Sequence, residues 1–114
     1  MRNYVKIFKA LSDSNRLRIL KMLEDCPMCV CEIRAVLNLA NSTVSKHLSL
    51  LREAGFILDE KNGKWVDYKL NDKTGNPQVR QLMKLMPEWL NDEARIKADK
   101  RKLESVDRNK ICNI

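Results

Sequence analysis

Three of the chain's four cysteines fall within one six-residue segment, Cys26-Pro27-Met28-Cys29-Val30-Cys31. Thiolates are soft metal ligands and nucleophiles, so such a cluster can bind a metal or metalloid, or undergo reversible oxidation. The alternative is that the three side chains serve only as small buried hydrophobic groups. Three thiols within six residues favour a ligand site over packing.

The remainder of the sequence indicates a cytoplasmic chain in which these thiols stay reduced. Charges are threaded through the apolar residues of Met1–Leu11 without a cleavage-site pattern, so we expect no secretory signal. No apolar run in the sequence approaches the roughly 20 residues needed to cross a bilayer. Reduced cysteines favour ligand binding or a redox switch over structural disulfides.

Length, composition and charge limit the class of protein. A chain of 114 residues is expected to form one small domain. Aromatic residues make up only 5%, which favours helices packed through aliphatic side chains. The net charge is +7, from 22 Lys and Arg against 15 Asp and Glu, and a small basic domain commonly binds nucleic acid.

Hydrophobic spacing and cap residues predict four helices in the first half of the chain. The first covers the N-terminal residues, and the second begins after the cap residues Ser12-Asp13-Ser14. Because proline fits the first turn of a helix, the third is expected to include Pro27 there, with Cys26 just outside it. The fourth runs from about Ser42 to Ala54 and ends at Gly55.

The second half of the chain changes to the periodicity of strands. Residues 56–61 and 64–70, joined by Asn62-Gly63, predict a hairpin with a type I′ turn. Asn76-Pro77 starts a further amphipathic helix, and Pro87 begins a new segment or kinks it. The charged stretch from residue 91 to residue 114 either extends this helix or frays.

This order of elements predicts a mainly α fold with a β-hairpin wing, a winged helix-turn-helix. Residues 1–90 would form the domain, with N- and C-terminal dimerisation helices, and residues 91–114 a charged helical or frayed extension. The terminal helices carry more apolar surface than one small core can cover. A homodimer formed through these helices would bury that surface.

The fourth helix is the expected DNA-reading element, because its apolar face leaves small polar and basic residues opposite the core. The N-terminal part of a recognition helix reaches base edges, so the base-reading candidates are Ser42, Thr43 and Lys46. Candidates for phosphate contacts are Ser45, Ser49, His47 (which could instead be packed), and Lys61 and Lys64 at the hairpin tip. An ordinary solvated helix is the alternative, and the hairpin that follows in the right order disfavours it.

Three segments resemble the ArsR/SmtB family of metal-sensing repressors. Residues 10–20, Ala-Leu-Ser-Asp-Ser-Asn-Arg-Leu-Arg-Ile-Leu, look like the family's second-helix signature, and residues 42–55 are similar to its recognition helix. Met28-Cys29-Val30-Cys31-Glu32-Ile33 looks like the arsenic-repressor box, Leu-Cys-Val-Cys-Asp-Leu. The resemblance covers about Val5 to Trp89 and implies a homodimeric repressor, not an enzyme, that releases its double-stranded operator DNA when As(III) or Sb(III) binds.

The identity of the third thiol ligand is not fixed by the sequence. The best-known arsenic repressors have a third cysteine three residues beyond the pair, where this chain has Arg34. Cys26 could take that place, as could Cys112 in the tail, and we favour Cys26 because it is local. In a regular helix Cys29 and Cys31 point about 200° apart. A ligand that gathers these thiols would therefore unwind or tilt the first turn of the third helix, which leads into the recognition helix.

Other interpretations of the thiols stay open. A zinc or cadmium sensor has the same fold, but zinc prefers four ligands and only three cysteines are local. The last helix also lacks the histidines of the family's other metal site. A redox-sensing repressor is compatible too. A thiol oxidoreductase would use Cys26-Pro27-Met28-Cys29 as its C-x-x-C motif, but no predicted strand precedes it. A constitutive DNA-binding protein would leave the cysteines unexplained.

Overall fold

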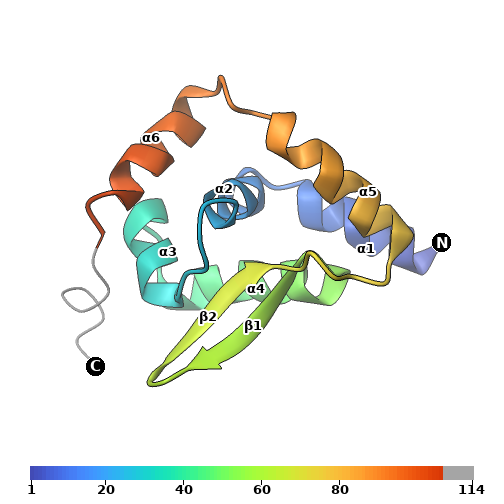
Figure 1. Cartoon of the computed structure of the whole chain (residues 1–114), viewed down its shortest axis with the longest axis horizontal. Helices are drawn as coiled ribbons and strands as arrows, with labels where there is room; N and C mark the ends of the chain where they lie inside the picture. The colour runs from blue at the N-terminus through green and yellow to red at the C-terminus, as the bar shows by residue number, and fades with distance from the viewer. Residues whose placement is uncertain (107–114) are drawn as a thin grey trace.

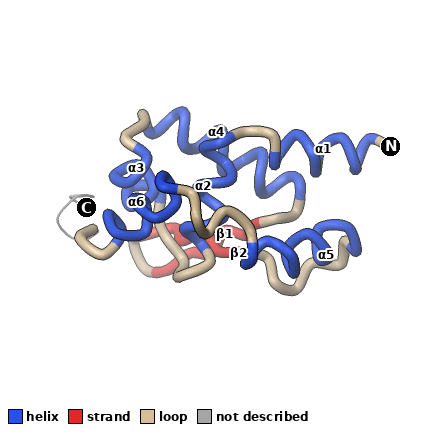
Figure 2. The backbone as a smooth tube through the Cα atoms, turned by 90° about the horizontal axis from the view of Figure 1, so that it is seen from above, coloured by secondary structure: helices blue, strands red, loops and turns tan. Residues whose placement is uncertain are grey.

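The computed structural model describes residues 1–106 and confirms the predicted winged helix-turn-helix. Its elements are α1 (Arg2–Leu11), α2 (Ser14–Leu23), α3 (Val30–Leu37), α4 (Asn41–Ala54), β1 (Ile57–Asn62), β2 (Trp65–Leu70), α5 (Pro77–Leu85), the short 3-10 helix η1 (Met86–Glu88) and α6 (Ala94–Leu103). The hairpin projects from the helices, with α1 and α5 towards one end of the molecule and α3 and α6 at the other (Figures 1 and 2). None of the helices described is both long and apolar enough to cross a membrane.

Local cap residues set several helix ends where the sequence predicts them. The Asp13 carboxylate accepts hydrogen bonds from the backbone N–H groups of Asn15 (2.8 Å) and Arg16 (3.1 Å) at the start of α2. The Asn76 side chain caps α5 in the same way, with Pro77 in the first turn. Gly55 ends α4 at φ +94°, a left-handed conformation that glycine adopts without strain.

The start of the third helix differs from the prediction. Helix α3 begins at Val30 rather than at Pro27, and Cys29 is its extended N-cap residue, with φ −86° and ψ 168°. Met28 donates its N–H to the Tyr68 carbonyl at 3.0 Å, and Tyr68 donates back to the Met28 carbonyl at 2.7 Å. The Met28 side chain is also buried in the core. Strand-type pairing with β2 and burial of Met28 therefore outweigh the preference of Pro27 for a first helical turn.

The hairpin turn lies one residue later than predicted. In the antiparallel register Asn62 pairs with Trp65, so Gly63-Lys64 forms the two-residue loop. Gly63 has φ +61°, whereas Lys64 does not have a positive φ. A positive φ at the first central residue alone is the pattern of a type II′ turn, which requires glycine there. The predicted type I′ turn at Asn62-Gly63 is therefore wrong, although the hairpin itself is confirmed.

Helix α6 is a separate helix that packs against α2 and α3. Arg18 on α2 makes two hydrogen bonds to the Asp99 carboxylate on α6, Nε–Oδ2 at 2.8 Å and Nη2–Oδ1 at 2.9 Å. These hydrogen bonds raise the pKa of Arg18 above its ordinary value, although burial opposes the shift. Lys102 donates to the Val36 carbonyl of α3 at 3.3 Å. Helix α6 thus holds α2 and α3 together.

Candidate functional site

The outer face of α4 presents the predicted DNA-reading side chains. Val44, Leu48 and Leu51 are buried, which turns the opposite face of the helix to solvent. On that face lie the exposed residues Ser42, Thr43, Ser45, Lys46 and Ser49, beside the half-buried His47. A shallow hollow of about 540 Å³ is lined by Ser42, Ser45, Lys46, Ser49 and Leu50. The structure therefore brings the predicted α4 residues onto one accessible surface.

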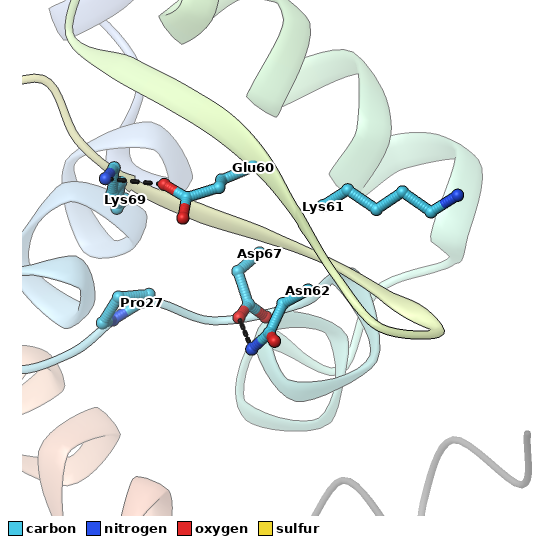
Figure 3. Close-up of a pocket in the computed structure, with 6 residues that line it drawn as sticks. All are labelled: Pro27, Glu60, Lys61, Asn62, Asp67 and Lys69. Carbon is cyan, nitrogen blue, oxygen red and sulfur yellow. Dashed lines mark hydrogen bonds and ion pairs between the residues drawn. The ribbon is translucent and has the colours of Figure 1, made fainter.

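One face of the wing adjoins the recognition helix. Alternating side chains of β1 point to opposite faces, so Lys61 shares a face with Asp59. Asp59 lies 3.3 Å from Arg52 of α4, which identifies this face as the one towards the recognition helix. Figure 3 shows the Lys61 side chain extending away from Pro27, Glu60 and Asp67. At the tip, the Lys64 ammonium lies 4.7 Å from the centroid of the Trp65 ring.

The other face of the wing has balanced charges. A cavity of about 230 Å³ is lined by Pro27 and by Glu60, Asn62, Asp67 and Lys69 of this face, and also by Lys61, whose side chain extends away from the others (Figure 3). Lys69 lies 2.7 Å from Glu60, and this hydrogen bond raises the pKa of Lys69. Asn62 donates to Asp67 at 3.0 Å. The lining carries the two carboxylates of Glu60 and Asp67 against two lysines, so this cavity offers no excess positive charge, and the α4 side of the hairpin is the better surface for a polyanion.

The three clustered thiols have different environments. Cys26 is exposed, Cys31 is half-buried, and Cys29 is buried with 3% exposure. Glu32 accepts a hydrogen bond from the Cys29 backbone N–H at 3.0 Å, which fixes the first turn of α3. Within residues 1–106, no three side chains of His, Cys, Asp or Glu are grouped closely enough to hold a metal ion. The thiols are thus neighbours in sequence without forming a ready ligand set, and Cys112 lies outside the described residues.

The backbone around Cys26 is anchored on both sides. Before it, Lys100 of α6 lies 3.7 Å from Asp25 and 3.8 Å from Glu24. Buried Lys21 also donates to Glu24 at 2.9 Å and to the Met86 carbonyl at 3.0 Å. After it, Met28 is paired with Tyr68 of the wing. The exposed thiol of Cys26 therefore sits between two fixed points on a short extended segment.

Two residues near these surfaces were not assigned a role from the sequence. Tyr68 provides both backbone partners of Met28, and Arg16 contacts His47 at 3.2 Å. The alternating pattern of the sequence around Tyr68 predicts a strand, but it does not predict which segment that strand pairs with. Met28 lies 40 residues earlier, so its pairing with Tyr68 could not be predicted from the sequence. Arg16 lies within the segment that resembles the family's second-helix signature, but its contact with α4 is seen only in the tertiary structure.

Comparisons with known proteins agree with this geometry. Residues 13–58 match the profile described as bacterial regulatory protein, arsR family. The arsenical resistance operon repressor of Escherichia coli (strain K12) is 43% identical over 68 residues, which are 59% of this chain and 58% of that protein. An arsenic resistance transcriptional regulator of Pseudomonas putida is 36% identical over 97 residues, which are 77% of this chain and 72% of that protein.

A solved structure supports the same assignment. The NMR structure of the cadmium metal-sensor CMTR from Mycobacterium tuberculosis has a TM-score of 0.59 and 32% identity, covering 77% of this chain and 84% of that one. Together with the sequence relatives, this makes the molecule a transcription regulator and not an enzyme, as the sequence predicts. The chain belongs to the ArsR family of bacterial regulatory proteins, with a winged helix-turn-helix that binds DNA.

Proposed function

We propose that the chain is a homodimeric repressor that releases its operator when As(III) or Sb(III) binds the thiolates of Cys26, Cys29 and Cys31. The observation that carries this proposal is the position of the thiols. They lie on one short segment whose backbone is hydrogen-bonded to the wing and continues directly into the helix-turn-helix. Trivalent arsenic is satisfied by three thiolates, and this number is available locally.

Ligand binding would have to move the extended segment. The exposed, buried and half-buried thiols differ in environment, so a shared ligand must draw Cys26 and Cys31 towards Cys29. Such a movement strains the hydrogen bonds between Met28 and Tyr68, because Cys26 is only two residues away. The disturbance would then reach β2 of the wing as well as α3. This route differs from unwinding of a helical turn, since Cys26 and Met28 precede α3.

Hydrogen exchange tests this route. We predict that arsenite accelerates exchange of the Met28 and Tyr68 backbone N–H groups, because both donate across the bridge. The Asn71 N–H, which donates to the Phe56 carbonyl at the other end of the hairpin, serves as a control and should keep its protection. The measurement is amide exchange by NMR in the reduced protein with and without arsenite. Equal protection of Met28 and Tyr68 in both states, while operator release still occurs, would exclude the bridge as the route.

The assigned DNA-binding residues predict two different effects of substitution: a loss of sequence specificity and a general loss of DNA affinity. Replacing Ser42, Thr43 and Lys46 with alanine should reduce the preference for operator over random DNA, because base contacts carry specificity. Replacing Lys61 or Lys64 with alanine should weaken binding to operator DNA and to random DNA alike. It should also reduce the slope of log affinity against log salt concentration by about 0.9 in magnitude for each phosphate that is no longer neutralised. Fluorescence anisotropy at several salt concentrations measures both quantities. Exposed Lys97 on α6 is the control for removal of a positive charge. Lys97→Ala should change neither the operator preference nor the salt dependence of binding. Operator preference that survives the triple substitution would contradict the assigned face.

Exposed apolar side chains on α1 and α5 support the proposed homodimer. On α1, the side chains of Tyr4, Val5 and Phe8 are exposed, and so is Leu85 at the end of α5. Helix α1 and the start of α5 lie towards the same end of the molecule (Figures 1 and 2). A two-fold dimer would cover these side chains and present two recognition helices to a symmetric operator. Sedimentation at concentrations around the operator dissociation constant tests this assembly.

A cadmium or zinc sensor is the second candidate, because the chain is similar to the cadmium metal-sensor CMTR. Titration of the reduced protein on labelled operator with arsenite, cadmium, zinc and peroxide separates the candidates. Arsenite should release the operator at the lowest concentration if three thiolates form the site. Release by cadmium at a lower concentration would support the second candidate, and release by peroxide alone would support a redox sensor.

A further inference from the structure

Arg16 joins the end of α1 to the start of α2. Its side chain is only 13% exposed. The guanidinium donates from Nε to the Ala10 carbonyl at 2.9 Å and from Nη2 to the Lys9 carbonyl at 2.8 Å. The last carbonyls of a helix have no partners within the helix, so these bonds complete the C-terminus of α1. Arg16 is thus held in one orientation by two fixed acceptors.

The same guanidinium reaches the recognition helix. Arg16 Nη1 lies 3.2 Å from Nδ1 of His47 on α4. An arginine side chain has only donors and keeps its proton, so His47 Nδ1 must be the acceptor. In a neutral imidazole with an accepting Nδ1, the proton is on Nε2. The contact therefore selects one tautomer, in which the outer nitrogen of the ring is a hydrogen-bond donor.

The surroundings compensate the charge of Arg16 and leave a basic surface beside it. The Asp13 carboxylate lies 3.9 Å from Arg16. Burial tends to raise the pKa of Asp13, but hydrogen bonds from the Arg16 and Asn15 backbone and the charge of Arg16 bring it below its ordinary value. Lys6, Lys9 and Arg16 line a cavity of about 340 Å³, in which these three basic side chains outnumber the one acidic side chain, Glu53. A phosphate near this side of α4 would meet a positive potential.

We propose that Arg16 is a positioning residue for DNA binding, which sets His47 as an Nε2–H donor to a backbone phosphate of the operator. This inference rests on α4 being the recognition helix. The half-buried His47 stands between exposed Lys46 and buried Leu48, at the edge of the reading face. A neutral donor at that edge fixes the register of α4 on the phosphate backbone without adding a charge. The inference does not depend on which inducer binds the thiols.

Two substitutions of His47 separate the roles of the ring nitrogens. Asparagine places an amide oxygen near the position of Nδ1, and glutamine places an amide nitrogen near the position of Nε2. We expect His47→Asn to weaken operator binding about tenfold, because it keeps the Arg16 contact but loses the outer donor. His47→Gln should weaken binding by only about threefold. The salt slope should stay unchanged in both, since a neutral donor displaces no counterion.

Arg16→Lys completes the experiment, with exposed Arg101→Lys on α6 as its matched control. We expect Arg16→Lys to weaken operator binding about tenfold. The double variant Arg16→Lys, His47→Asn should bind little more weakly than either single variant, because the effects of residues that act through each other are not additive. In the DNA-free protein, a ¹H–¹⁵N spectrum of the ring should show the Nε2–H tautomer in the wild type and a mixture in Arg16→Lys. An Nδ1–H tautomer in the wild type overturns the inference. So does tighter operator binding by His47→Asn than by His47→Gln.

Discussion

Cys29→Ser should abolish release of the operator by arsenite while leaving operator binding intact. In the wild type, a coupling of about 1–3 kcal/mol between inducer and DNA corresponds to a roughly 5- to 150-fold loss of operator affinity. In the variant, saturating arsenite should change the affinity by less than about twofold. A hydroxyl does not replace a thiolate as a soft ligand, so the site would retain only two of its three donors.

The position of Cys29 makes this substitution a clean test. Cys29 is the N-cap residue of α3, and serine is among the preferred residues at an N-cap. The variant should therefore keep the start of α3, and thermal unfolding should show a native transition. Loss of the arsenite response could then not be attributed to a disrupted helix.

The other cysteines supply the matched comparisons. Cys31→Ser should also lose the response, and Cys26→Ser should weaken it because its exposed segment must move to the ligand. Cys112→Ser is the control, and it should respond like the wild type. A full arsenite response in Cys29→Ser would contradict the assigned site. A response that is lost only in Cys112→Ser would assign the third ligand to the tail.

Asp99→Asn should produce a large loss of stability, although Asp99 lies outside the hydrophobic core. It removes the charge that faces Arg18 across the α2–α6 interface, where the Asp99 side chain is 5% exposed. Removing one partner of a buried ion pair generally costs about 3–5 kcal/mol, because the other charge stays buried without compensation. We expect about 3 kcal/mol here, since Arg18 keeps some solvent contact and a hydrogen bond to Asn15. Urea unfolding followed by circular dichroism measures the free energy of unfolding.

Two controls separate burial of the pair from charge removal in general. Asp59→Asn breaks the exposed pair with Arg52 and should cost no more than about 1 kcal/mol. Replacing Arg18 and Asp99 together with apolar residues should recover much of the stability, as for other buried pairs. If Asp99→Asn and Asp59→Asn destabilise the protein equally, the Arg18–Asp99 pair does not anchor α6. If the apolar double variant stays as unstable as Asp99→Asn, buried charge is not the cause.

The sequence alone determined the elements whose signals are local. The caps at Asp13 and Asn76, the glycine that ends α4 and the spacing of Val44, Leu48 and Leu51 act within a few residues, so they predict helix ends and buried faces. The exposed reading face of α4 follows from the same spacing.

Only the tertiary structure decided the features that depend on distant partners. Pro27 has the local preference of a first helical turn, but Met28 pairs with Tyr68, 40 residues later, and this holds the segment extended. The contacts of Arg16 with His47 and of Arg18 with Asp99 join residues 31 and 81 positions apart. Local propensities are small next to the burial and hydrogen bonding that such contacts provide. The spacing of apolar and capping residues in the sequence therefore determines where helices form. Packing between distant segments determines how the thiols are connected to the DNA-reading face.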